Sequence, residues 1–147
     1  MYISHVPRAL SAVNRVFGTR TLLSQQPHHR TFSSSRPHYT AEMVKPVQSI
    51  DEFKQIISGN KVAVFDFWAT WCGPCRVISP IFEKLASQTD GVDFYKVDVD
   101  EQPEISQEVG VRAMPTFIAF KNGAKIGEVV GANPAKLQEL IQKSAAV

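Results

Sequence analysis

Apolar and polar positions change their period several times after Val44, and each period predicts a different element. Residues 61–68 are almost continuously apolar and rich in β-branched and aromatic side chains, which is typical of a central strand covered on both faces. Residues 92–99 form a second long strand by the same criteria, and we expect a first strand over Met43–Val47. The last two strands, 116–120 and 125–130, should pair as a hairpin around Asn122-Gly123, a strong turn signal.

Helical spacing separates these strands. Ser49 and Glu52 have the spacing of a capping box, which opens a short helix that Gly59 ends. A longer helix runs from Cys72 toward Gln88. Its inward face should hold apolar residues at helical steps, namely Val77, Ile78, Ile81, Phe82, Leu85 and Ala86. Pro80 lies inside this pattern and should kink the helix without ending it, because the apolar period continues beyond it.

Two further helices are expected, one over 101–108 with Pro103 in its first turn and one that starts at Asn133-Pro134. The predicted order is β-α-β-α-β-α-β-β-α. Helices interleaved with buried strands imply an α/β fold. We therefore predict a three-layer α/β/α sandwich with a central mixed five-stranded sheet that ends in an antiparallel hairpin.

Charge is distributed unevenly along the chain. Residues 1–41 contain five arginines and no acidic residue, whereas residues 42–147 hold eleven basic and fourteen acidic residues, a net charge of −3. Apolar residues near the N-terminus would line one face of a helix: Ile3, Val6, Leu10, Val13 and Phe17. An amphipathic leader that is rich in Arg and Ser and free of acid is typical of a mitochondrial transit peptide.

The segment Arg30–Ser33 resembles a matrix processing site, so we expect cleavage near 32/33, with a site a few residues later as the alternative. A basic tail that the mature protein retains is the other interpretation of the leader. The chain is thus divided into a transit peptide with a linker over 1–41 and a folded domain over 42–147.

Histidine and cysteine usage excludes several functions. All four histidines lie in the leader, so residues 42–147 offer no Cys–His nucleophile pair and no histidine-based zinc site. Two cysteines cannot supply four thiolates to a structural zinc site, and no metal is expected. No apolar stretch approaches the ~18–20 residues of a membrane span. The net charge of +2 averages a basic leader with a mildly acidic domain, so it does not indicate a nucleic-acid partner, and none is expected. We also expect no membrane partner and a monomer.

The two cysteines, Cys72 and Cys75, stand three positions apart just after the apolar strand 61–68. One helical turn separates the Cα atoms of such a pair by about 5 Å, inside the ~4.4–6.8 Å range of a disulfide. At the start of a helix, free backbone N–H groups and the helix dipole stabilise a thiolate, which makes Cys72 the attacking group. A redox-active dithiol is favoured over a structural disulfide or half of an intermolecular metal site.

Asp66 is a carboxylate inside the apolar strand 61–68. Burial there would raise its pKa and suit it to passing a proton to or from Cys75. The alternative is an aspartate at a strand edge that faces solvent.

These motifs resemble the thioredoxin family over residues 44–147. The resemblance rests on the segments Phe67–Cys75, Ala113–Thr116 and Val130–Ala132, together with Asp66 and Pro80, in the family's order. It implies the thioredoxin fold and protein-disulfide reductase activity, in which Cys72 attacks a substrate disulfide and Cys75 resolves the mixed disulfide.

The resemblance also implies roles for residues beside the dithiol. Gly73 would allow a substrate backbone to approach, and Pro74 would stiffen the turn; in this family a Gly-Pro pair between the cysteines marks a reductant. Lys96 matches a lysine near the buried carboxylate, with an ordinary surface charge as the alternative. Trp68 is expected in the core.

The expected substrate-binding residues are Trp71, Met114, Pro115, Gly131 and Ala132. Pro115 matches a cis-proline loop that faces the dithiol, where the backbone beside Met114 would pair with an extended substrate segment. Gly131 and Ala132 match the neighbouring loop, and Trp71 should cover the site.

The resemblance implies that the chain needs no cofactor of its own. Reducing equivalents would come from NADPH through a thioredoxin reductase, and clients would be disulfide-containing proteins such as peroxiredoxins. The leader suggests a mitochondrial member that maintains thiol redox balance in the matrix. Two other functions stay open: a module that binds a partner in one redox state, and an oxidase or isomerase, which the Gly73-Pro74 pair disfavours.

Overall fold

The computed structural model describes residues 42–147, and the expected transit peptide lies outside the described residues. The strands are β1 (Val44–Pro46), β2 (Val62–Trp68), β3 (Val92–Asp98), β4 (Thr116–Lys121) and β5 (Ala124–Val130). The helices are α1 (Ile50–Ser58), α2 (Gly73–Gln88), α3 (Pro103–Val109) and α4 (Pro134–Ala145). The element order is the predicted one. Within the described part of the chain, no helix is long and apolar enough to cross a membrane.

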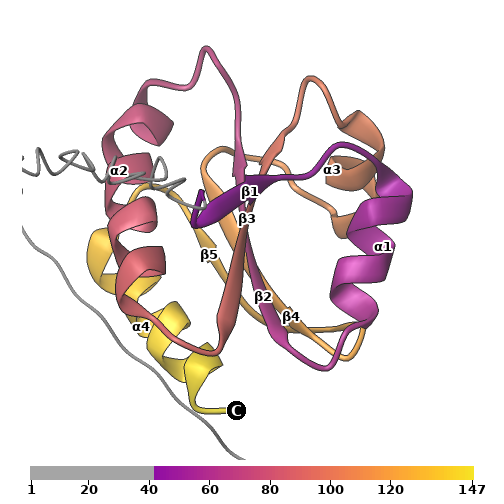
Figure 1. Ribbon diagram of the computed structural model, residues 1–147. Helices are drawn as coiled ribbons and strands as arrows, with labels where there is room; N and C mark the ends of the chain where they lie inside the picture. The colour runs from indigo at the N-terminus through magenta and orange to yellow at the C-terminus, as the bar shows by residue number, and fades with distance from the viewer. Residues whose placement is uncertain (1–41) are drawn as a thin grey trace, which may run out of the picture. The chain divides into compact units, whose positions relative to one another are not determined.

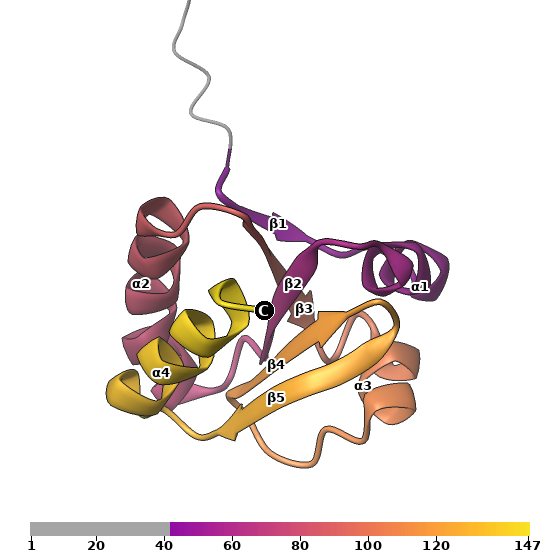
Figure 2. The same cartoon turned by 90° about the horizontal axis from the view of Figure 1, so that it is seen from below.

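The strands form one mixed sheet in the order β1-β3-β2-β4-β5 (Figures 1 and 2). The strands β1, β2 and β3 run parallel, whereas β4 pairs antiparallel with both β2 and β5. The central strand β2 is paired along both edges, and all its residues except Trp68 are buried. The predicted three-layer α/β/α sandwich is confirmed.

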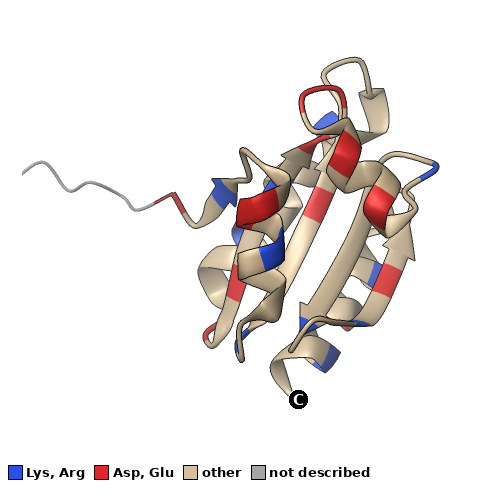
Figure 3. Ribbon diagram, turned by 90° about the vertical axis from the view of Figure 1, so that its right-hand side faces the viewer, with Lys and Arg blue, Asp and Glu red and all other residues tan. Residues whose placement is uncertain are grey.

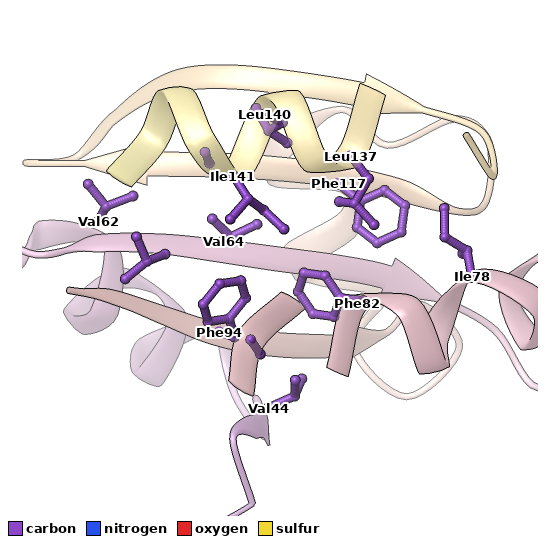
Figure 4. Close-up of a cluster of buried hydrophobic side chains, with 13 residues drawn as sticks. Val44, Val62, Val64, Ile78, Phe82, Phe94, Phe117, Leu137, Leu140 and Ile141 are labelled. Carbon is purple, nitrogen blue, oxygen red and sulfur yellow. The ribbon is translucent and has the colours of Figure 1, made fainter. Parts of the chain in front are cut away.

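Helices cover both faces of the sheet, with α2 and α4 on one side and α1 and α3 on the other (Figure 1). Successive side chains of a strand point to opposite faces. Val64 therefore packs with Phe82 of α2 in the core under α2 and α4 (Figure 4), whereas Phe65 packs with Phe53 of α1 in the other core. Asp66 lies two positions after Val64, so it faces the α2 side.

The start of α1 confirms the predicted capping box. Ser49 Oγ accepts a hydrogen bond from the Glu52 backbone N–H at 3.1 Å, and Glu52 Oε2 accepts one from the Gln48 N–H at 2.8 Å. Both acceptors satisfy backbone donors that have no partner inside the helix. Charged residues are distributed over the helices on this side of the sheet (Figure 3). Asp51 of α1 and Glu104 of α3 are both exposed.

The helix α2 begins directly after Cys72 and continues through Pro80, so the proline does not end it, as predicted. The prediction that Val77 faces inward is wrong, because its side chain is 71% exposed. The buried residues of α2 are Cys75, Ile78, Phe82 and Ala86, at steps of three and four. Val77 precedes Ile78 by about 100° of helical rotation, which turns it to solvent.

The predicted hairpin between β4 and β5 has a two-residue loop, Asn122-Gly123. Both residues have positive φ, 49° and 78°, as a type I′ turn requires. The turn brings β5 back along β4. The strand β5 then ends at Val130, just before the loop that precedes α4.

We predict that Ser49→Ala lowers the free energy of unfolding by about 1 kcal/mol, because the Glu52 N–H loses its acceptor. Urea unfolding of the oxidised protein measures this. The control is Ser58→Ala in the same helix, where the hydroxyl donates to the Lys54 carbonyl and caps no N–H group. A loss as large in the control as in Ser49→Ala would contradict the capping role.

Candidate active site: the Cys72–Cys75 disulfide and Asp66

The two cysteines lie where β2 passes into α2. β2 ends at Trp68, and a short loop, closed by the Cys72 N–H donating to the Ala69 carbonyl at 3.1 Å, leads into the helix. Cys72 is the N-cap of α2, and Cys75 lies in its first turn. The dithiol is therefore held between a strand buried on both faces and a helix packed on it.

Cys72 and Cys75 form a disulfide with a Cα–Cα distance of 5.3 Å, as the spacing predicted. The Cys75 backbone N–H donates to Cys72 Sγ at 3.2 Å, so the sulfur occupies the place of a capping oxygen. After reduction, the same N–H and the positive end of the helix dipole stabilise negative charge on this sulfur. Cys72 is 4% exposed and Cys75 1%, so both cysteines are buried in the oxidised protein.

Asp66 is buried, at 3% exposed, and does not face solvent at a strand edge. Burial raises its pKa to about 7, and the nearby charge of Glu83 acts in the same direction. The hydrogen-bonding capacity of the nearby Ser79 hydroxyl and the charge of Lys96 oppose this rise. Among the groups of residues 42–147, none donates a hydrogen bond to Asp66 Oδ1. A pKa near neutrality allows the carboxyl group to take up and release a proton under physiological conditions.

A pocket of about 340 Å³ adjoins both functional groups; we call it the Asp66 pocket. Its lining includes Asp66, Cys75, Ser79, Lys96, Glu83 and Arg76. Glu83 and Arg76 are exposed residues, so the pocket opens to solvent. Protons therefore have a route between Asp66 and bulk water.

Lys96 lies beside Asp66 in the register of β2 and β3 and lines the same pocket. Its ammonium group, however, binds Glu42 Oε1 at 2.8 Å. Lys96 is thus more than an ordinary surface charge, because it acts on Asp66. Its ammonium group is, however, also paired with Glu42. Glu42 was not predicted as part of the site, because nothing in the order of the residues indicates a contact 54 positions away.

The Met114–Pro115 peptide bond is cis, as the resemblance implied. Met114 packs against the small cluster formed by Ala69, Cys72 and Cys75. The Gly131 N–H donates to the Pro115 carbonyl at 2.8 Å, which fixes the loop after β5 against the proline loop. Gly131 has a φ of 93°, a conformation that favours glycine.

The other residues expected to bind substrate or to tune the dithiol are also near the surface. Ala132, Gly73 and Pro74 are exposed, the last two in the first turn of α2. Trp71 is 65% exposed, and its Nε1–H donates to Asp100 Oδ2 at 2.9 Å. This bond, which the sequence analysis missed, holds an aromatic surface just before Cys72.

The expectation that Trp68 belongs to the core is wrong. Its side chain is partly buried and packs against the cluster of Ala69, Cys72 and Cys75, and it lines the Asp66 pocket. Trp68 is the last residue of β2, at the end of the strand that leads to the cysteines. Its side chain thus lines the site.

Metal-binding groups are sparse in the described part of the chain. Between residues 42 and 147, no cluster of three or more His, Cys, Asp or Glu side chains could hold a metal ion.

A disulfide at the start of a helix, beside a buried carboxyl group in a three-layer α/β/α fold, defines a dithiol–disulfide oxidoreductase. The sequence matches the thioredoxin family over residues 44–143. It is 60% identical over 105 residues to a thioredoxin of Malassezia sympodialis, covering 70% of this chain and 100% of that protein.

Solved structures agree with this match. The mitochondrial thioredoxin 3 of Saccharomyces cerevisiae is 43% identical, with a TM-score of 0.65 over 68% of this chain and 94% of that one. A chain from a study of thiol resolution in yeast mitochondrial 1-Cys peroxiredoxin through glutathione and thioredoxin systems is 42% identical, with a TM-score of 0.65 over 68% of this chain and 94% of that one. The chain belongs to the thioredoxin family, and it is a protein-disulfide reductase that needs no cofactor of its own.

We predict that Asp66→Asn stabilises the protein at pH 8 but not at pH 4. The folded-state pKa of about 7 exceeds the usual 3.8, so the folded state binds the proton more tightly and loses stability as pH rises from about 4 to about 7. The difference between the two pKa values corresponds to a loss of at most about 4 kcal/mol in the free energy of unfolding. A neutral asparagine does not ionise and so does not suffer this loss. Urea unfolding of the oxidised protein at both pH values measures it.

The control for this prediction is Asp90→Asn, which neutralises an exposed carboxylate. It should leave the pH dependence of stability as in the wild type. Equal stability of wild type and Asp66→Asn at pH 8 would contradict the raised pKa of Asp66.

Proposed function

We propose that Cys72 is the attacking thiol of this reductase, that Cys75 is the resolving thiol, and that Asp66 accepts the proton of Cys75. The observation that carries the proposal is the hydrogen bond from the Cys75 N–H to Cys72 Sγ. It stabilises a thiolate at Cys72, whereas Cys75 and Asp66 are both buried and line one pocket.

In the first step the Cys72 thiolate attacks a client disulfide. A bond forms between Cys72 Sγ and one client sulfur, the client S–S bond breaks, and the other client sulfur leaves as a thiolate. In the second step Cys75 gives its proton to Asp66, and its sulfur attacks Cys72 Sγ. The Cys72–Cys75 bond forms, the second client thiolate leaves, and two electrons have passed from the dithiol to the client.

The proposed client-binding surface surrounds Cys72. The cis-proline loop at Met114–Pro115 packs against the disulfide and is hydrogen-bonded to Gly131. Ala132 follows Gly131 and Trp71 precedes Cys72, and both are exposed. The backbone beside Met114 would pair with an extended client segment. Gly73 and Pro74 complete this surface at the start of α2.

We further propose that NADPH regenerates the dithiol through a thioredoxin reductase, and that the clients of this monomer include peroxiredoxins. Family membership supports the first part. The similarity to a chain studied with a yeast mitochondrial 1-Cys peroxiredoxin supports the second.

The mitochondrial matrix is the proposed location, with residues 1–41 as the transit peptide and linker and 42–147 as the thioredoxin domain. The support is the acid-free leader with its five arginines, together with the similarity to a mitochondrial yeast thioredoxin.

We predict that residues 42–147 reduce insulin disulfides catalytically when NADPH and a thioredoxin reductase are supplied, and that Cys75→Ser accumulates mixed disulfides on Cys72. Without the resolving thiol, the second step cannot follow the first. NADPH consumption and mass spectrometry of thiol-blocked complexes measure the two effects. Cys72→Ser is the matched control and should trap no client.

Two results would count against this mechanism. Trapping by Cys72→Ser instead of Cys75→Ser would reverse the order of attack. Binding of a client in one redox state without turnover would favour a redox-dependent binding module.

We predict that isolated mitochondria import the full chain and cut it near 32/33. The mature N-terminus, read by mass spectrometry of the protease-protected product, tests this. Arg30→Gln should reduce cleavage there, whereas the control Arg36→Gln, beyond the expected site, should not. An unprotected, uncut chain would show that the leader is no transit peptide.

A further inference from the structure

The hydroxyl group of Ser79 lies between the resolving cysteine and the buried carboxylate. Ser79 is one helical turn beyond Cys75 on α2 and partly buried, and its Oγ donates to the Cys75 carbonyl oxygen at 2.8 Å. The same side chain lines the Asp66 pocket together with Asp66 and Cys75. Serine often bonds in this way to the carbonyl four residues earlier, but here a second acceptor lines the same pocket.

That second acceptor is Asp66. The Ser79 hydroxyl is the hydrogen-bond partner that lowers the pKa of Asp66 against the effect of burial. A serine hydroxyl carries one proton, so it can donate to the Cys75 carbonyl or to the Asp66 carboxylate but not to both at once. The direction of the O–H bond therefore depends on whether Asp66 is ionised.

We propose that Ser79 is a positioning residue of the reaction, whose hydroxyl proton turns from the Cys75 carbonyl to the Asp66 carboxylate whenever Asp66 is ionised. The proposal rests on the proposed role of Asp66 as the acceptor of the Cys75 proton. Ser79 itself neither gains nor loses a proton. The proton that leaves Cys75 Sγ is bound by Asp66, and the Ser79 O–H bond only rotates.

This rotation stabilises the ionised carboxylate before resolution, in a site where the buried charge is otherwise costly. When Asp66 takes up the proton, the hydroxyl returns to the Cys75 carbonyl, the arrangement seen in the structure. Ser79 thus keeps a fraction of Asp66 ionised near neutral pH, which the acceptor role requires.

The charged groups around Asp66 do not by themselves stabilise its ionised form, so a neutral hydrogen-bond donor can contribute. On β3, Lys96 lowers the pKa of Asp66, but its ammonium group is paired with Glu42 at 2.8 Å. On α2, Glu83 raises this pKa, and Arg76 lines the pocket while its guanidinium donates to the Thr70 carbonyl. On β4, the residue paired with Asp66 is the apolar Phe117.

The test is the pKa of Asp66 in the oxidised protein, measured by carbon NMR of its carboxyl group. Ser79→Ala should raise it by ~0.5–1 unit, the size of a lost hydrogen bond to a partly ionised group. Ser79→Thr keeps a hydroxyl group and should restore most of the shift. The control Ser87→Ala removes a hydroxyl that donates to the Lys84 carbonyl on the same helix and should change nothing.

A second readout is the pH profile of insulin reduction, whose acidic midpoint should move upward in Ser79→Ala by the same amount. An unchanged pKa of Asp66 in Ser79→Ala, or a shift as large in Ser79→Thr as in Ser79→Ala, would overturn the proposal.

The variant Asp66→Asn separates the proposed role of Ser79 from the proposed role of Asp66. If Asp66→Asn reduces insulin at the wild-type rate, the acceptor role of Asp66 fails, and the role of Ser79 fails with it. If Asp66→Asn is slow while Ser79→Ala leaves the pKa of Asp66 unchanged, the role of Ser79 alone fails.

Discussion

The burial of Asp66 in the central strand is the constraint on which the site depends. A carboxyl group with 3% exposure favours its neutral form, and this raises its pKa into the physiological range. The fold must tolerate that group, because β2 is paired on both edges and covered on both faces. An arrangement that would be a defect in an ordinary core thus places a carboxyl group that titrates near neutral pH in the same pocket as a buried cysteine.

The same strand also positions the dithiol. Because β2 is fixed on every side, the loop after Trp68 starts from a rigid point, and α2 begins with Cys72 as its cap. The sulfur then receives a backbone N–H at 3.2 Å, and Cys75 lies one turn deeper on the side of Asp66. The two cysteines and the buried carboxyl group are thus held by one strand and the helix that follows it.

Much of the fold follows from local signals. The capping box at Ser49, the turn at Asn122-Gly123 and the apolar strand 61–68 each predicted their elements, because each is governed by neighbouring residues. The errors concern direction: Val77 and Trp68 are apolar, yet one faces solvent and the other borders the site. An apolar residue at the margin of a helical face or at the end of a strand has no local signal that decides its side.

Neighbours along the chain set the spacing of the cysteines, the apolar surroundings of Asp66 and the order of the elements, so these could be predicted. Which distant groups meet at the site became visible in the folded protein. Glu42 pairs with Lys96, Asp100 holds Trp71, and Gly131 binds the carbonyl of Pro115. The physical reason is that such contacts arise where the twisted sheet and its helices bring separate loops together, and no periodicity in the sequence records that meeting.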